Sequence, residues 1–285
     1  KGTTNKVLTM SNDVLIEGKA LIFNVLGLRL HAKQWGNPEG IPTIALHGWL
    51  DNANTFDRLA PLMPELNLVA LDFAGHGLST HRAEGVHYHP IYDIQEVLAV
   101  ANELNWHQFN VIGHSMGGKT AMIFSMLHSK YLNKLVIVDI APKKYEPKFN
   151  YLFLALKALN LGKYSSRKEI EIELAKTVSE QSLVFFLLKN IGRDSNNNFF
   201  FKSNVNVLHQ NLIILMNKLT ISHKIFVDTF FVKGDKSDYI NESDVIFVKD
   251  KFPNSEIISI PNSGHWVHAE NPEYFNMKLL QILKN

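Results

Sequence analysis

The segment Gly113-His114-Ser115-Met116-Gly117 decides the fold of this chain because of the residues on either side of it. The apolar run Phe109–Ile112 before it is typical of a buried strand, and Lys119–His128 after it is typical of a helix. Glycines at the first and last positions allow a sharp turn that lifts the serine hydroxyl clear of the sheet. The segment therefore predicts a nucleophile elbow, with Ser115 as the nucleophile.

Strand-like and helix-like segments alternate on both sides of the elbow, after a predicted hairpin around Gly27. The expected strands are Thr43–Leu46, Leu68–Phe73, Phe109–Ile112, Leu135–Ile140, Thr229–Val232 and Glu256–Ile260. The expected helices are Thr55–Met63, Ile91–Leu104, Lys119–His128, Glu242–Lys251 and Pro272–Leu283. This rhythm predicts an α/β fold with a doubly wound, mainly parallel sheet.

The alternation stops at Ala141-Pro142, and residues 141–224 (the insert) show helical patterns without a convincing buried strand. The expected helices of the insert are Phe149–Leu159, Ser166–Val178, Gln181–Leu188 and Val205–Lys218, with a surface turn at Asn196–Asn198. We expect residues 13–140 and 225–285 to form the α/β core, and the insert to form a helical cap over the active site. Residues 1–12 are polar, and we expect them to be poorly ordered.

Composition excludes several classes of protein. The chain has 46% hydrophobic and 20% charged residues and a net charge of +2, which is typical of a globular protein and not of a nucleic-acid binder. It has no cysteine, and therefore no disulfide framework, thiolate nucleophile or cysteine-based zinc site. No apolar run reaches the roughly 20 residues that span a bilayer. We expect a cytoplasmic protein; because the chain begins with Lys1, an N-terminal targeting segment is left open.

Charge is unevenly divided between the insert and the rest of the chain. The insert holds 13 Lys and Arg against 6 Asp and Glu, a net charge of +7. A solvated helical surface accounts for this excess, and attraction of anionic substrates is the alternative.

The histidine partner of Ser115 is expected in the loop after the last strand, where the sequence reads Asn262-Ser263-Gly264-His265-Trp266. A serine hydroxyl becomes a good nucleophile when a histidine removes its proton. His265 is therefore the predicted base. His268 is the competing histidine, but it falls at the start of the predicted closing helix.

The acid that orients the histidine has two candidate positions. Asp139 ends an otherwise apolar strand, where an unpaired carboxylate would be costly. Asp235 and Asp238 follow the strand Thr229–Val232 and flank Ser237, in a loop where many proteins of this fold carry the acid. We favour Asp139, with Ser237 as a hydrogen-bonding neighbour, and the later loop remains the alternative.

An oxyanion hole needs two backbone N–H groups near the nucleophile. Met116, directly after Ser115, supplies one of them. The loop after the strand Thr43–Leu46 reads His47-Gly48-Trp49, and the Trp49 N–H is the natural second donor. We expect a structural role for His47.

Taken together, these residues resemble the α/β-hydrolase superfamily over nearly the whole chain. Within it, the second half is similar to the YbfF-type esterases, and the first half looks more like the serine-hydrolase-like branch. The segments that carry the first resemblance are Gly113–Lys119, Val138–Pro142, Ser165–Glu169, Phe186–Asp194 and Gly264–Glu270. The segments that carry the second are His47–Pro61 and Asp72–Ser79.

The resemblance implies a compact helical cap, hydrolysis of acyl esters or thioesters, and no cofactor. It also supports Ser115, Asp139 and His265, since the aspartate of the Val138–Pro142 segment matches Asp139.

The sequence thus predicts a serine hydrolase that cleaves carboxylic esters or thioesters of small to medium acyl groups through an acyl-enzyme. No metal, nucleic acid or membrane span is expected, and the partner is a small acyl substrate. Two alternatives stay open: a ligand-binding protein with the hydrolase fold, and an acyltransferase or perhydrolase that uses the same triad.

Overall fold

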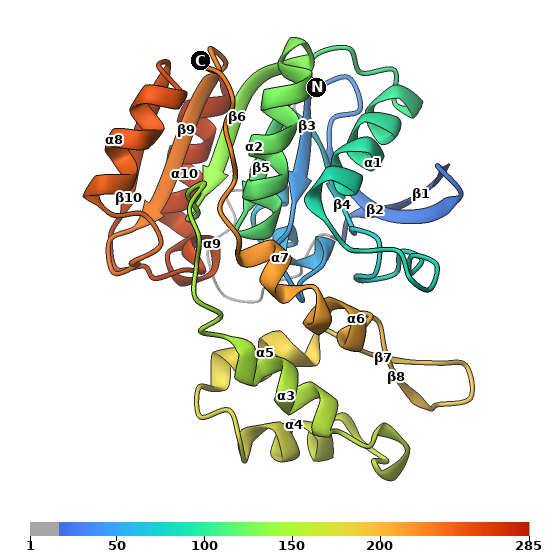
Figure 1. Cartoon of the computed structure of the whole chain (residues 1–285). Helices are drawn as coiled ribbons and strands as arrows, with labels where there is room; N and C mark the ends of the chain where they lie inside the picture. Colours follow the sequence, from blue (N-terminus) through green and yellow to red (C-terminus); the bar gives the residue numbers. More distant parts are fainter. Residues whose placement is uncertain (1–16, 285) are drawn as a thin grey trace, which may run out of the picture.

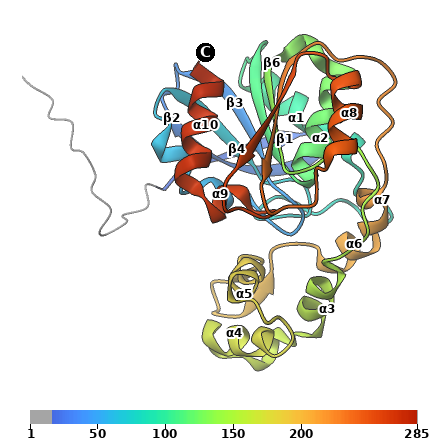
Figure 2. The ribbon, with the colours of Figure 1, turned by 90° about the vertical axis from the view of Figure 1, so that its left-hand side faces the viewer.

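One eight-stranded sheet with helices on both faces organises the chain in the computed structural model, which describes residues 17–284 (Figures 1 and 2). The strands follow the order β1-β2-β4-β3-β5-β6-β9-β10; β2 pairs antiparallel with β1 and β4, and all other pairs are parallel. Their bounds are β1 Lys19–Val25, β2 Leu28–Gly36, β3 Ile41–Leu46, β4 Leu66–Leu71, β5 Phe109–His114, β6 Leu132–Val138, β9 Asp228–Gly234 and β10 Ser255–Ile260. The predicted fold class is confirmed, while the predictions for residues 1–12 and the first residues of the core lie outside the described residues.

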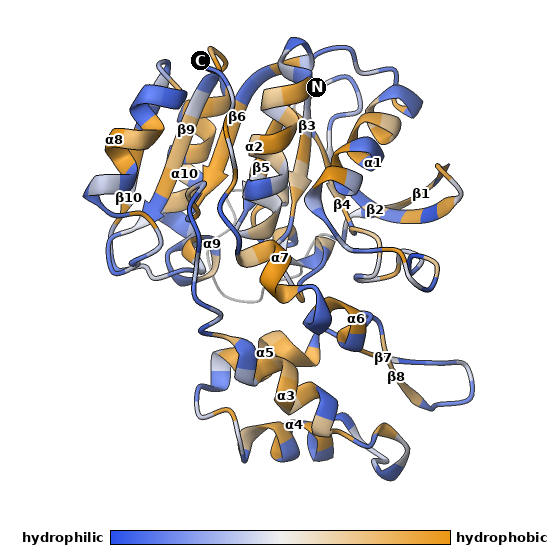
Figure 3. Cartoon of the chain, in the orientation of Figure 1, coloured by the Kyte–Doolittle hydropathy of each residue, from blue (hydrophilic) through white to orange (hydrophobic). Residues whose placement is uncertain are grey.

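The helices of the core are α1 Pro90–Glu103, α2 Met116–His128, α8 Glu242–Lys251, α9 Val267–Glu270 and α10 Pro272–Lys284. Strand alternation divides the apolar side chains between two cores, one on each face of the sheet. In β3, for example, Ile44 and Leu46 pack in the core under α1 and α2, whereas Ala45 packs in the core under α10. Hydrophobic residues accordingly concentrate on the parallel strands and on α2 (Figure 3). Among the described helices, none is long and apolar enough to cross a membrane.

The insert lies between β6 and β9 in sequence and beyond the carboxyl ends of the parallel strands in space (Figures 1 and 2). Its elements are α3 Asn150–Ala158, α4 Arg167–Ala175, α5 Gln181–Leu188, β7 Ile191–Arg193, β8 Phe199–Phe201, α6 Val205–Gln210 and α7 Leu212–Met216. The antiparallel pair of β7 and β8 corrects the expectation that the insert is helical throughout, without a convincing buried strand. Strands of three residues are too short to give a periodic signal. The predicted turn at Asn196–Asn198 connects them.

Two predicted helices are wrong in part. The helix expected at Thr55–Met63 is replaced by two short 3₁₀ turns, at Ala53–Phe56 and Ala60–Leu62. Pro61 explains the break, because proline lacks an N–H and its ring clashes with the carbonyl four residues earlier in an α-helix. In the insert, the helix expected at Val205–Lys218 is divided into α6 and α7 at Asn211.

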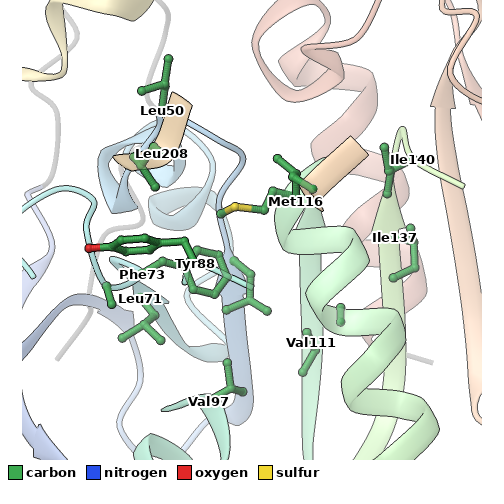
Figure 4. Close-up of a cluster of buried hydrophobic side chains, with 14 of the residues drawn as sticks. Leu50, Leu71, Phe73, Tyr88, Val97, Val111, Met116, Ile137, Ile140 and Leu208 are labelled. Carbon is green, nitrogen blue, oxygen red and sulfur yellow. The ribbon is translucent and has the colours of Figure 1, made fainter. Parts of the chain in front are cut away.

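The elbow after β5 is packed so closely that only glycine fits on either side of it. A Cβ atom at Gly113 would lie 2.3 Å from the Gly117 carbonyl oxygen, and one at Gly117 would lie 2.3 Å from that of Leu46 in β3. Ser115 itself has a φ of 52°, a left-handed conformation that is strained for a side chain. Met116, the first residue of α2, joins the buried cluster shown in Figure 4. The turn therefore fixes where the serine hydroxyl points.

Candidate active site

The structure brings Ser115, His265 and Asp139 together at the carboxyl ends of β5, β10 and β6. The Ser115 Oγ lies 3.1 Å from His265 Nε2, and His265 Nδ1 lies 2.9 Å from Asp139 Oδ2. These distances allow the hydroxyl to donate to Nε2 while Nδ1–H donates to the carboxylate. The arrangement can therefore activate a serine hydroxyl and hold the histidine in one tautomer.

Asp139 is fully buried, and three donors surround its carboxylate. Oδ1 accepts from the backbone N–H of Gly234 at 3.1 Å, and Oδ2 accepts from Ser237 Oγ at 2.5 Å as well as from the histidine. These bonds compensate for the loss of water around a buried carboxylate. Ser237 has the position of hydrogen-bonding neighbour that the sequence predicted for it.

The alternative acids lie elsewhere. Asp235 accepts from the backbone N–H of Ser263 at 3.1 Å, and Asp238 forms an exposed ion pair with Lys148. Within residues 17–284, neither carboxylate is hydrogen-bonded to His265. Their geometry is that of loop and surface residues.

The two predicted oxyanion donors lie close to Ser115. A Cβ atom added at Gly48 would lie 3.4 Å from the Ser115 Cβ, so the backbone directly before Trp49 passes beside Ser115. Met116 begins α2, and the first N–H groups of a helix have no partner within it. Among the described residues, the Trp49 N–H has no hydrogen-bond acceptor either. Both groups are therefore available to an oxyanion.

His47 orients the peptide unit that contains the Trp49 N–H. Its Nδ1 donates to the Gly48 carbonyl at 2.7 Å, and its Nε2 accepts from the Phe73 N–H at 3.1 Å. Burial lowers the pKa of His47, more than Asp72 and Asp51 raise it, so the ring stays neutral. Because the Gly48 carbonyl and the Trp49 N–H belong to one peptide plane, His47 holds the expected structural position.

Sequence reasoning missed two side chains that position His265. The Tyr239 ring stacks on the histidine ring, with centroids 3.8 Å apart. Glu270 accepts from the backbone N–H groups of Gly264 and Trp266, at 2.8 and 3.1 Å, and so fixes the loop on both sides of the histidine. Glu270 ends the segment Gly264–Glu270 that carries part of the family resemblance, but a hydrogen bond across six residues of a loop cannot be predicted from spacing.

His268, the competing base in the sequence, is buried beside the site. Its Nε2 is 3.0 Å from the Thr55 Oγ1, and its ring packs against the His114 ring, with centroids 4.7 Å apart. Burial lowers the pKa of His268 to about 4, so it is neutral near pH 7. Its Nε2 is paired with Thr55, whereas the Ser115 hydroxyl is paired with His265.

An apolar pocket opens above Ser115, between the core and the insert. Its lining consists of Gly48, Trp49, Leu50, Asp51, His114, Ser115, Phe149, Leu152, Phe153, Phe186, Leu212, Met216, His265 and Trp266. This lining contains neither Lys nor Arg, so the basic excess of the insert lies outside it. In the part of the chain that the structure describes, no group of three or more His, Cys, Asp or Glu could hold a metal ion.

Comparison with known proteins identifies the family to which the fold belongs. The profile of the α/β-hydrolase fold family matches residues 42–272. A putative esterase/lipase of Haemophilus influenzae is 32% identical over 234 residues, which cover 81% of this chain and 79% of the relative. A human serine hydrolase-like protein is 44% identical over 109 residues, 38% of this chain and 54% of its own length. Among solved structures, a marine microorganism esterase superimposes with a TM-score of 0.84 at 33% identity, over 88% of this chain and 98% of its own. The chain belongs to the α/β-hydrolase family, and the expected membership is confirmed.

The depressed pKa of His268 makes a prediction about stability and pH. An unfolded chain binds a proton at this histidine below about pH 6.5, whereas the folded protein does so only near pH 4. Wild-type stability should therefore decrease as pH falls through this window. His268→Gln keeps a polar partner for Thr55 but does not titrate, so between pH 7 and 4.5 it should lose about 2–3 kcal/mol less than wild type. Urea unfolding at both pH values measures the difference, and equal losses would show that burial does not depress this pKa.

Proposed function

We propose that this protein is a serine hydrolase that cleaves carboxylic esters or thioesters of small to medium acyl groups through an acyl-enzyme. The observation that carries the proposal is the hydrogen-bonded series from Ser115 through His265 to buried Asp139, beneath an apolar pocket. The names of the esterase relatives agree with this chemistry.

The first half-reaction uses the serine as nucleophile. The Ser115 Oγ attacks the acyl carbonyl carbon while His265 Nε2 takes its proton, and Asp139 stabilises the resulting imidazolium. The carbonyl oxygen becomes an oxyanion, to which the N–H groups of Trp49 and Met116 donate. His265 then returns the proton to the leaving alcohol or thiol, and the acyl group stays on Ser115.

Water completes the cycle by the same route. It enters after the leaving group has departed, gives a proton to His265 and attacks the acyl-enzyme carbonyl. The second tetrahedral intermediate collapses when His265 protonates Ser115 Oγ, which releases the carboxylic acid. Proton and charge balance are restored without a cofactor.

The pocket favours an acyl chain. Aromatic and aliphatic side chains from the insert, such as Phe149, Leu152 and Phe186, line the pocket together with Ser115. We infer that residues 141–224 act as a cap, with residues 13–140 and 225–285 as the core. Attraction of anionic substrates has weaker support, because Lys143 is paired with Asp244 at 2.5 Å and the lining has no basic side chain.

A matched substrate screen tests the proposed reaction. We expect turnover of p-nitrophenyl esters with a maximum at short to medium acyl chains, and decreasing rates once the chain exceeds the pocket. Acyl-CoA thioesters run in parallel test the thioester branch. Ser115→Ala should lower kcat by at least about 10⁴-fold while its thermal unfolding remains near that of wild type.

Other outcomes of the screen distinguish the alternatives. Tight binding of acyl ligands with no turnover would favour a ligand-binding protein. Product formation that rises with added alcohol or peroxide instead of water would favour an acyltransferase or perhydrolase. Turnover that is unchanged in Ser115→Ala would contradict the proposal itself.

The identity of the acid gives a separate prediction. Asp139→Asn should lower kcat about 10³–10⁴-fold, since an amide favours the wrong histidine tautomer. Asp235→Asn and Asp238→Asn serve as matched controls on the neighbouring loop and should each cost less than about tenfold. Steady-state measurement of kcat for the three variants identifies the acid. A larger loss in Asp235→Asn or Asp238→Asn than in Asp139→Asn would assign the role of acid to the later loop.

A further inference from the structure

We propose that Asn190 of the insert is a positioning residue of the active site, which holds the loop that carries the Trp49 oxyanion donor. The Asn190 Nδ2 donates to the Leu50 carbonyl at 2.7 Å, from a side chain that is fully buried. The inference rests on the proposed function and goes beyond it, because it makes the insert part of the catalytic geometry as well as the pocket wall. It also gives a role to the residues that follow Phe186 in the segment Phe186–Asp194, of which the proposed chemistry uses only Phe186.

The loop that Asn190 holds is strained. Residues 48–51 form a turn in which the Asp51 N–H donates to the Gly48 carbonyl at 3.2 Å. Leu50, the third residue of this turn, has a φ of 59°, where glycine or asparagine is usual. Such a conformation costs about 1–3 kcal/mol and persists only where the surroundings enforce it. The Asn190 amide is one of the contacts that enforce it.

Asn190 is well placed to act as a fixed anchor. Its Oδ1 accepts from Ser203 Oγ at 2.5 Å, and its backbone carbonyl accepts from the Lys202 N–H at 2.7 Å. Both residues follow β8, so the base of the β7–β8 hairpin fixes the asparagine on two sides. With Oδ1 engaged, the amide orientation that directs Nδ2 to Leu50 is determined.

Two further contacts join the insert to the same loop. Lys189 Nζ lies 3.5 Å from Oδ1 of buried Asp51, so consecutive residues of the insert hold consecutive residues of the loop. Leu50 and Leu208 of α6 belong to the same buried cluster (Figure 4). The polar and apolar contacts therefore act together on residues 50 and 51, next to the Trp49 N–H.

The expected consequence is a loss of transition-state stabilisation with little change in substrate binding. Asn190→Asp keeps the shape of the side chain and its bond to Ser203. It removes the Nδ2 donor, and a carboxylate oxygen then faces the Leu50 carbonyl oxygen, which repels it. The loop can then relax, and the Trp49 N–H no longer meets the oxyanion. Because removal of one oxyanion donor typically costs 10²–10³ in kcat, misplacing one should cost about 10–100-fold, with KM within about threefold.

Asn211→Asp is the matched control. Asn211 is also a buried asparagine of the insert, but its Nδ2 donates within the insert, to the Val207 carbonyl at 2.8 Å. The same substitution there should leave kcat within about threefold of wild type. Equal losses in both variants would mean that Asn190 contributes only to the stability of the insert.

A transition-state analogue separates positioning from general damage. An acyl trifluoromethyl ketone forms a tetrahedral adduct whose oxyanion needs the oxyanion hole. The corresponding ether occupies the pocket but forms no adduct and therefore no oxyanion. In Asn190→Asp, affinity for the ketone should fall about 10–100-fold while affinity for the ether is unchanged. Equal affinities for the ketone in variant and wild type would overturn the proposal, even if Ser115→Ala has abolished turnover as the proposed function requires.

A second pair of variants, with milder substitutions at the surface, tests the proposal if Asn190→Asp does not fold. Lys189→Met removes the ion pair with Asp51 from a half-exposed position, and Lys176→Met removes a pair with Glu173 inside the insert. We expect the first to lower kcat at least about threefold at constant KM, and the second to have no effect. No change in Lys189→Met would contradict the coupling between insert and loop.

Discussion

The backbone turn at Ser115 is the constraint on which the rest of the site depends. The strand β5 must end and the helix α2 must begin within one residue, so Ser115 adopts a left-handed φ of 52°. Its N–H donates to Val138 of β6, and the Gly117 N–H donates to His47 after β3. The turn thereby aligns the ends of three strands and brings the loop that carries Trp49 beside Ser115. One helical turn later, Lys119 Nζ donates to the carbonyls of Leu215 and Asn217, at 2.8 and 2.7 Å, and so ties the helix to the end of the insert.

Burial of Asp139 is the second organising feature, because a buried carboxylate has to be matched by donors. Its partners come from three separate places: Gly234 at the end of β9, Ser237 in the following loop, and His265 after β10. The carboxylate therefore connects the ends of β6, β9 and β10 as well as orienting the histidine. Loss of one donor leaves the other two in place, whereas loss of the carboxylate leaves all three without their acceptor.

The parts of the fold that sequence could predict are those encoded locally. Apolar strands, the glycine-flanked Ser115 and the Gly264-His265 turn are short-range patterns, and their order in the chain places them on neighbouring parallel strands. The choice between Asp139 and the later loop could not be made from spacing, because β6 and β9 are adjacent and end at the same edge of the sheet. The helix expected at Thr55–Met63 is wrong because its apolar pattern resembles that of a helix, whereas Pro61 prevents a continuous α-helix there.

Contacts between segments far apart in the chain could not be predicted from the sequence. The stacking of Tyr239 on His265 joins two loops, and the bond from Asn190 to Leu50 spans 140 residues. Neither contact leaves a periodic or motif signal: the first depends on how the loops after β9 and β10 meet, and the second on how the insert meets the core. The same limit applies to β7 and β8, whose three-residue strands are defined by their pairing.

The central claim is that Ser115 forms a covalent acyl intermediate, and an active-site-directed fluorophosphonate tests it most directly. Incubation with the reagent, digestion and peptide mass mapping should reveal one phosphonyl adduct, on Ser115, at one equivalent per chain. The variant His265→Ala should be labelled much more slowly than wild type, because Ser115 then lacks the base that removes its proton. An adduct on another residue, or no adduct in protein that is folded and active on esters, would contradict the account.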